Sequence, residues 1–416
     1  MRRVAINLDA LRASRDFRLL AIGGVLSGLG TQAALVAVPY QVYVLTHSAG
    51  LVGLLGLAEL GPMIVVSLLG GAVADRIDRR ILLLAAQLAT ILAAGALAMI
   101  SFAGHPSVVL VFVLAALLAG GSSLQLTAQS SIVPGLVGDR LRSALAFNFG
   151  AAQLTAIVGP ALGGLTIAAY DVGAAYLVDV VSCLALVAAG LAIGPQHPTG
   201  RPDGPQDPIF TSIREGLRFV RHNNALLGSF VIDLVAMTFG MPRALFAILS
   251  LTVYHAGAGG AGLLYAAVAA GATLAAVTTG WLEHARRLGR IVVFAVLAWG
   301  AAIAAAGLVG SIWPAAALLA VAGAADSVSA VCRSTINQTV TPDAMRGRMS
   351  SVFGLVVTGG VRLGDVEAGG VASLTSARTS VLSGGLACLL GVGLVVIAFP
   401  SLVAYDAGER QMGEIL

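Results

Sequence analysis

Nine ionisable side chains lie inside stretches of sequence that are otherwise long and apolar enough to cross a membrane. An ionisable group within a bilayer is costly, so it normally faces the protein interior or a water-filled path and serves a function. Six of the nine are carboxylates and three are guanidinium groups, so ion pairing cannot neutralise every acid. A carboxylate without a cation in a low-dielectric medium favours its protonated form, and it can therefore carry a proton if it is wetted in turn. The nine are Glu59, Asp179, Asp233, Arg243, Asp326, Arg333, Arg362, Asp365 and Glu367.

Spacing along predicted helices groups some of these residues. Arg362 and Asp365 are three positions apart and can pair on one helical face, whereas Glu367 points to another side. Asp326 and Arg333 are seven positions apart, so they share a face about two turns apart and could bracket one water-filled path. We predict that proton coupling or the cavity involves Glu59, Asp233, Asp326, Arg333, Arg362, Asp365 and Glu367.

The roles of Asp179 and Arg243 are less clearly indicated by the sequence, and the histidines do not suggest a metal site. Asp179 follows a short loop, and either a structural or a functional role fits it. Arg243 lies near the end of its apolar stretch, where an arginine can extend its head group to the membrane surface. The six histidines fall in loops without metal-ligand spacing, and we predict no metal site.

Composition determines which elements must position these residues. Of the 416 residues 58% are hydrophobic and 11% are charged, whereas soluble domains carry roughly 25% charged residues. Apolar stretches of at least 18 residues recur about twelve times, which predicts a bundle of transmembrane helices rather than a barrel of short alternating strands. The predicted spans are 19–45, 50–74, 81–103, 107–131, 143–169, 174–193, 225–252, 259–282, 291–310, 314–338, 349–375 and 380–400.

The arginine distribution predicts orientation and domain limits. Arginines cluster at the N-terminus and in alternate loops, so both termini are predicted to be cytoplasmic. The polar segment 194–224 reads as a cytoplasmic linker, and its second part, from Ile209, has the apolar periodicity of an amphipathic surface helix. We therefore expect an N-terminal half (1–193), this linker, a C-terminal half (225–400) and a cytoplasmic tail (401–416).

An internal repeat relates the two halves. A shift of 208 residues places Pro134 on Pro342, Arg140 on Arg348 and Ser143 on Ser351. Two parallel six-helix halves are the architecture of transporters that rock about a site near the midplane. Channels and membrane enzymes seldom need such symmetry, and we predict that the chain is not an enzyme.

Two motifs resemble those of a known family. In "GGAVADRIDRR", Gly71, Asp75, Arg76, Arg79 and Arg80 match the loop signature of the major facilitator superfamily, although Asp78 stands where that signature usually has glycine. Charges at these positions can pair across the halves and hold the cytoplasmic side in one state. We call these five residues the gate motif.

The second motif lies in the predicted helix 143–169. Gly150, Gly159, Pro160, Gly163 and Gly164 resemble the motif of the antiporter branches of that superfamily, and glycines around a proline favour a bendable, closely packed helix. Segments spread over nearly the whole chain, including "VAVPYQVYVLTHSAGLVGLLGL" and "TPDAMRGRMSSVFGL", are similar to the bacterial enterobactin (siderophore) exporter group. The resemblance implies efflux of a siderophore or a similar amphiphile driven by protons.

The expected protein is therefore an all-α, twelve-helix transporter of the bacterial inner membrane. We expect proton-coupled efflux of a small amphiphile, a siderophore or a drug, by alternating access, with the proton gradient as energy source and no cofactor. The expected partners are the substrate, protons and membrane lipid, and not nucleic acid. A lysolipid flippase or metabolite importer of the same fold is an alternative, and a non-transporting membrane receptor or assembly factor is an alternative of another class.

Overall fold

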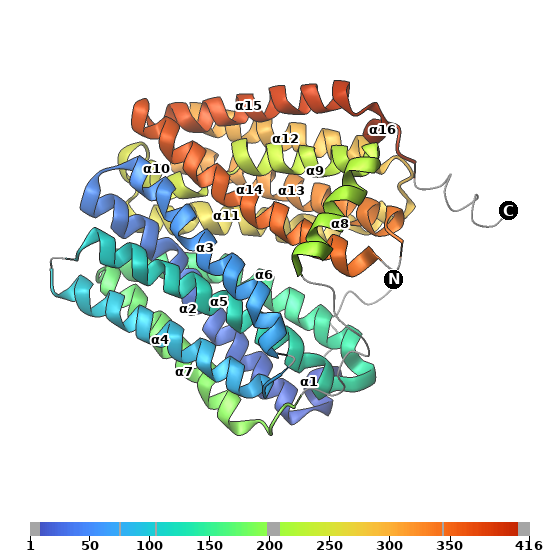
Figure 1. Ribbon diagram of the computed structural model, residues 1–416. Helices are drawn as coiled ribbons and strands as arrows, with labels where there is room; N and C mark the ends of the chain where they lie inside the picture. Colours follow the sequence, from blue (N-terminus) through green and yellow to red (C-terminus); the bar gives the residue numbers. More distant parts are fainter. Residues whose placement is uncertain (1–8, 75, 105, 198–208, 343–344, 407–416) are drawn as a thin grey trace. The chain divides into compact units, whose positions relative to one another are not determined.

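The computed structural model describes residues 9–74, 76–104, 106–197, 209–342 and 345–406. Every regular element in these ranges is a helix (Figure 1). Asp75 of the gate motif, residues 198–208 of the predicted linker and the end of the predicted tail lie outside the described residues.

The long helices correspond to the predicted apolar stretches. In the first part of the chain they are α1 (Asp9–Ala13), α2 (Arg15–Thr46), α3 (Ala49–Ala74), α4 (Arg79–Phe102), α5 (Val108–Val137), η1 (Gly138–Arg140), α6 (Leu141–Ala169) and α7 (Val172–Ala192). The remainder are α8 (Ile209–His222), α9 (Asn224–Phe239), η2 (Arg243–Leu245), α10 (Phe246–Thr252), α11 (Gly257–Thr278), η3 (Thr279–His284), α12 (Leu288–Leu308), α13 (Ile312–Val340), α14 (Arg346–Leu374), α15 (Ala377–Ala398) and α16 (Pro400–Val403).

Ten of these segments are long and apolar enough to cross a membrane by length and composition. One of the ten, 108–169, contains both α5 and α6, and α14 is a 29-residue helix that is not among them. Counting α5 and α6 separately and adding α14 gives the predicted twelve, so the all-helical membrane fold is confirmed while the number of spans stays a prediction.

The described chain forms two compact units. The first comprises 1–47, 57–204 and 256–266. In it α2 packs against α5, α6 and α7, and α4 packs against α5 and α7 (Figure 1). Phe17, Leu83, Ile132 and Leu186 are fully buried at its core.

The second unit comprises 48–56, 205–255 and 267–416. Its helix α12 packs against α13 and α15, while α14 packs against α9 and α15 (Figure 1). The amphipathic helix predicted from Ile209 is present as α8, which lies against α9 and α14. Its place at the membrane surface stays a prediction.

The predicted span 225–252 is interrupted rather than continuous. Helix α9 ends at Phe239, and helical structure resumes only at Arg243 in η2. Pro242 cannot donate a backbone hydrogen bond and disfavours the helical conformation of Met241, which explains the break. The indole Nε1 of Trp299 donates to the freed carbonyl of Gly240 at 2.8 Å, so this buried backbone group keeps a partner.

Candidate coupling site

Arg333 lies between two carboxylates in the second unit. Its guanidinium forms an ion pair with Asp233 of α9, and its Nη2 lies 3.6 Å from Oδ1 of Asp326. The side chains of Arg333 and Asp233 are each 2% exposed, whereas that of Asp326 is 23% exposed. We call Asp233, Asp326 and Arg333 the carboxylate–arginine triad.

Packing of two helices assembles the triad. Asp326 and Arg333 both lie on α13, and Asp233 reaches them because α9 packs beside that helix. The axial separation of Asp326 and Arg333 is about 10 Å at the helical rise. Side chains on a helix tilt toward its N-terminus, so the long arginine side chain can extend back to Asp326. The two residues therefore contact each other directly, which is closer than the bracketing arrangement that the spacing predicts.

This arrangement makes two acids compete for one cation. Losing the cation from either ionised carboxylate in so buried a site is costly, because desolvation is then uncompensated. If one acid takes up a proton, the guanidinium can pair fully with the other. Asp326 has the longer contact and the greater exposure, so it is the acid that solvent reaches more readily.

A second ion pair lies on α14. Nη1 of Arg362 is 3.5 Å from Oδ2 of Asp365, as the spacing of three residues predicts. Asp365 is 5% exposed, so this pair holds a second buried acid of the second unit.

Arg243 is a functional candidate that sequence reasoning placed at the membrane surface. It lies directly after the helix break and attracts both Asp326 and Asp365 electrostatically. The signal that could have indicated this role is the Gly-Met-Pro sequence before it, since such residues end a helix. Arg243 therefore joins the charges of the second unit.

The other two predicted acids are Glu367 and Glu59. Glu367 is half-buried on α14, and no ion pair to it occurs in the described part of the chain. Glu59 is half-buried on the portion of α3 that belongs to the first unit, where it acts electrostatically on the buried Tyr176. The structure therefore brings together five of the seven predicted residues in two ion-paired groups.

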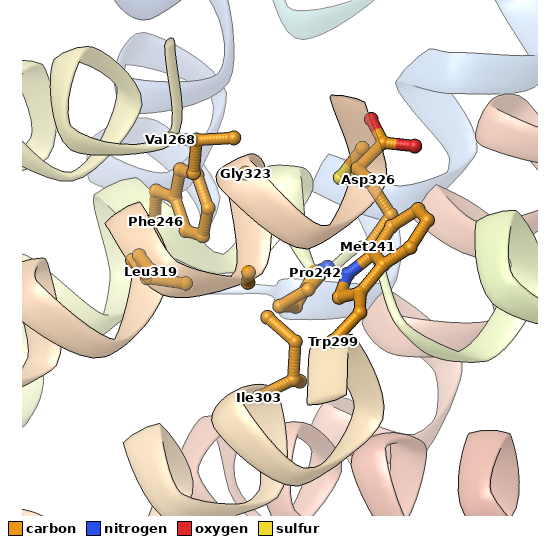
Figure 2. A pocket seen from close by; sticks show the side chains of 10 residues that line it. Met241, Pro242, Phe246, Val268, Trp299, Ile303, Leu319, Gly323 and Asp326 are labelled. Carbon is orange, nitrogen blue, oxygen red and sulfur yellow. The ribbon is translucent and has the colours of Figure 1, made fainter. Parts of the chain in front are cut away.

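A small pocket adjoins the triad. Figure 2 shows Asp326 at one end of it, with Phe246 and Leu319 at the other. The pocket has a volume of about 10 Å³, room for about one water molecule, and its remaining lining is apolar. It is lined by Met241, Pro242, Phe246, Val268, Trp299, Ile303, Leu319, Ala322, Gly323 and Asp326. The more exposed acid of the triad therefore borders a small, mostly apolar space.

The gate motif is described in part. Arg79 Nη1 donates to the carbonyl of Ser131 at 2.8 Å, and Arg80 Nη2 donates to the carbonyl of Leu191 at 2.9 Å. Asp78, the departure from the family signature, caps α4, because its Oδ1 accepts from the backbone N–H of Arg80 and of Gln196, both at 2.9 Å. In this structure the hydrogen bonds of Arg79, Arg80 and Asp78 therefore hold the start of α4 against other segments of the first unit.

We expect replacement of Asp78 with alanine to destabilise the first unit by about 1–2 kcal/mol, the typical cost of losing a helix N-cap. Thermal unfolding of the purified protein would measure this loss. The control is Asp78→Asn, which keeps an acceptor oxygen and should retain most of the stability. Equal losses in both variants would show that the charge of Asp78, rather than its hydrogen bonds, is what matters.

The glycine motif of α6 permits close helix packing. A Cβ atom built on Gly159 would lie 2.5 Å from Cβ of Gln32, and one on Gly163 would lie 2.7 Å from Cα of Ala33. Both residues therefore face α2. A Cβ atom on Gly164 would lie 2.7 Å from the carbonyl oxygen of Ala258, which belongs to the same unit. A bending role for Pro160 and Gly150 stays a prediction.

These helices, with their buried charge cluster, define a multi-pass membrane protein with the fold of major facilitator transporters. A peptide-transporter-family protein in complex with a thioalcohol conjugated peptide has a TM-score of 0.73 at 12% identity, over 93% of this chain and 96% of that one. The nucleoside transporter NupG gives a TM-score of 0.72 at 12% identity, over 94% and 98%. A bacterial homolog of the human lysosomal transporter Spinster gives 0.70 at 14% identity, over 95% and 97%.

The chain belongs to the family described as "Transmembrane secretion effector", whose family model matches residues 8–412. It is 28% identical over 398 residues to a protein named enterobactin exporter EntS from Shigella boydii serotype 4 (strain Sb227), which covers 94% of each chain. A protein of the same name from Escherichia coli (strain SMS-3-5 / SECEC) is 27% identical over 412 residues, 98% of this chain and 97% of that one. The chain is therefore a transporter and not an enzyme, and its predicted superfamily and resemblance are confirmed.

Proposed function

We propose that this transporter exports a small amphiphile in exchange for protons, and that the carboxylate–arginine triad couples the two movements. The observation that carries the proposal is the sharing of Arg333 by Asp233 and Asp326. A buried guanidinium with two alternative acid partners has two discrete pairings, which is the property that a proton-driven switch requires.

Asp326 is the acid that exchanges protons in this proposal. When Asp326 is protonated, Arg333 pairs with Asp233 alone. When Asp326 gives up its proton, the guanidinium is drawn between both carboxylates. Alternating access follows if one pairing suits each orientation of the transporter, because a ligand shifts the population only through a difference in affinity between states.

The pocket beside Asp326 suggests how substrate enters this scheme. The pocket has room for about one water molecule in this conformation, so substrate binding requires it to widen. Its apolar walls would then favour an aliphatic or aromatic part of an amphiphile, and the acid at one end a hydrogen-bond donor or a cation. A cationic group of the substrate beside Asp326 would favour the ionised carboxylate and so oppose its protonation. Substrate and proton would then compete for the same end of the pocket.

Export, rather than import, is supported by the names of the similar proteins, which are enterobactin exporters, and by the α6 glycine motif. A siderophore like enterobactin is the first substrate to test, and a drug is the second. The proposal includes location in the bacterial inner membrane with both termini cytoplasmic, and use of the proton gradient without a cofactor. A lysolipid flippase or a metabolite importer would use the same fold, whereas a receptor would not move substrate.

Proteoliposomes containing the purified transporter test this function. With enterobactin or another amphiphile outside, substrate should accumulate in vesicles whose interior is more acidic, because departing protons drive it inward. Each proton exchanged per substrate is worth about tenfold accumulation for one pH unit. Accumulation that ignores the gradient would refute proton coupling, and no movement of any amphiphile would favour a receptor.

A further inference from the structure

Asp179 is a buried acid that the triad does not use. It lies on α7 of the first unit and is 1% exposed. Its Oδ1 lies 3.4 Å from the Thr31 hydroxyl and 3.6 Å from the Cys183 thiol, while its Oδ2 is buried without a hydrogen-bond partner. Both neighbours are neutral groups.

Proton counting around Thr31 shows that an ionised Asp179 fits this site poorly. The Thr31 hydroxyl also lies 3.1 Å from the backbone carbonyl of Ser27, which can only accept. A hydroxyl has one proton, so it cannot donate to that carbonyl and to a carboxylate at once. A protonated Asp179 removes the conflict, because it donates to the Thr31 oxygen while Thr31 donates to Ser27.

The contact lengths agree with a neutral acid. A hydroxyl that donates to an ionised carboxylate usually lies about 2.5–2.7 Å away, whereas the Thr31 contact is 3.4 Å. Cys183 is a weak donor, and its thiol also lies 3.7 Å from the hydroxyl of Ser27. An ionised Asp179 would therefore be held by one long hydroxyl contact and one weak thiol contact, both to the same oxygen.

Within the part of the chain that the structure describes, the elements packed against α7 bring no cation to Asp179. On α2 the facing polar groups are Thr31 and Ser27, and on α4 Gln87 bonds Ser27 and Gln125 rather than the acid. Arginines of α2, α4 and α6 lie at the starts of those helices. Arg80 binds the carbonyl of Leu191, twelve residues beyond Asp179 and therefore about 18 Å along the helix.

The remaining titratable groups near this site are acids or neutral groups. Tyr176 and Cys183 lie on α7 itself, and the Tyr176 hydroxyl donates to Gln41 at 2.7 Å. Glu59 of α3 acts on Tyr176 and would add negative charge rather than compensate it. Among the described residues, Thr31 and Cys183 are the hydrogen-bonding neighbours of the Asp179 carboxylate, and both are neutral.

We propose that Asp179 is a proton-binding site of the first unit, occupied in this structure by a proton that the acid donates to Thr31. The bound proton stabilises the packing of α2 against α7, where a Cβ atom on Gly30 would lie 2.7 Å from Cα of Asp179. Loss of the proton would leave an uncompensated charge at this close contact, so the first unit responds to pH separately from the triad. This proposal concerns only whether Asp179 carries a proton, and it does not depend on protons driving transport.

Infrared difference spectroscopy of the purified protein in lipid nanodiscs tests the proposal without transport. The difference between wild type and Asp179→Asn at neutral pH should contain the carbonyl band of a protonated carboxylic acid. The matched control is Asp171→Asn, because Asp171 lies exposed at the start of the same helix and caps it by accepting from Ala174 N at 2.7 Å. Its difference spectrum should contain ionised carboxylate bands instead.

Thermal unfolding provides a second measurement. The unfolded chain releases the proton of an aspartate above about pH 4, whereas the folded protein keeps it at Asp179, so folding takes up a proton. The stability of wild type should therefore fall relative to Asp179→Asn as pH rises. Carboxylate bands in the Asp179 difference spectrum, or parallel pH profiles of the two proteins, would overturn the proposal.

Discussion

Replacement of Arg333 with glutamine should abolish transport and lower the free energy of unfolding by about 3–5 kcal/mol, the usual cost of removing one partner from a buried ion pair. The change leaves Asp233, which is 2% exposed, without its cation, and it weakens the compensation of Asp326. Thermal or denaturant unfolding in detergent measures the loss of stability, and the proteoliposome assay measures the loss of transport.

Two further variants separate this explanation from general damage. Arg362→Gln removes a guanidinium that is 18% exposed, compared with 2% for Arg333, so its cost should be smaller. In the double variant Arg333→Gln/Asp233→Asn, the buried acid is neutral, and a large part of the stability should return while transport stays absent. An Arg333→Gln protein as stable as Arg362→Gln would mean that the triad is not the buried charge centre described here.

Replacement of Asp326 with asparagine should separate substrate movement from the proton gradient. Asparagine keeps the size of the side chain but cannot exchange a proton at this position, while Arg333 still pairs with Asp233. With equal pH on both sides of the membrane, substrate should still exchange across it. With a difference of one pH unit, wild type should accumulate substrate about tenfold per proton exchanged, and the variant should not accumulate it.

A neighbouring acid provides the control for that variant. Glu367 lies on α14, and no ion pair to it is described, so Glu367→Gln should keep gradient-driven accumulation if the triad alone carries the proton. Loss of accumulation in Glu367→Gln, with Asp326→Asn unaffected, would transfer the coupling role from the triad to α14.

The sequence predicted the helices well because apolar length decides where a membrane span can lie. Predicted and observed bounds of most spans differ by a few residues, as for 349–375 and Arg346–Leu374. The break at Gly240–Pro242 was not predicted, since hydropathy does not register backbone conformation and the flanking residues are apolar throughout. That break places Arg243 beside two acids, a role that its position in the sequence concealed.

The residue types of the candidate site were predictable, but most of its pairings were not. The Arg362–Asp365 pair follows from helical periodicity. Asp233 and Arg333 are a hundred positions apart, so only the packing of α9 on α13 brings them together. Similarly, the neutral surroundings of Asp179 depend on which faces of α2 and α7 meet, and the sequence alone left its role open.

The central claim is that one acid of the triad exchanges a proton each time substrate crosses. The most direct measurement is the internal pH of acidic proteoliposomes, read with an entrapped dye while substrate is added outside. Wild type should release protons as substrate enters, and Asp326→Asn should admit substrate without any change in internal pH. Substrate-dependent proton release of the same size in both proteins would contradict the account.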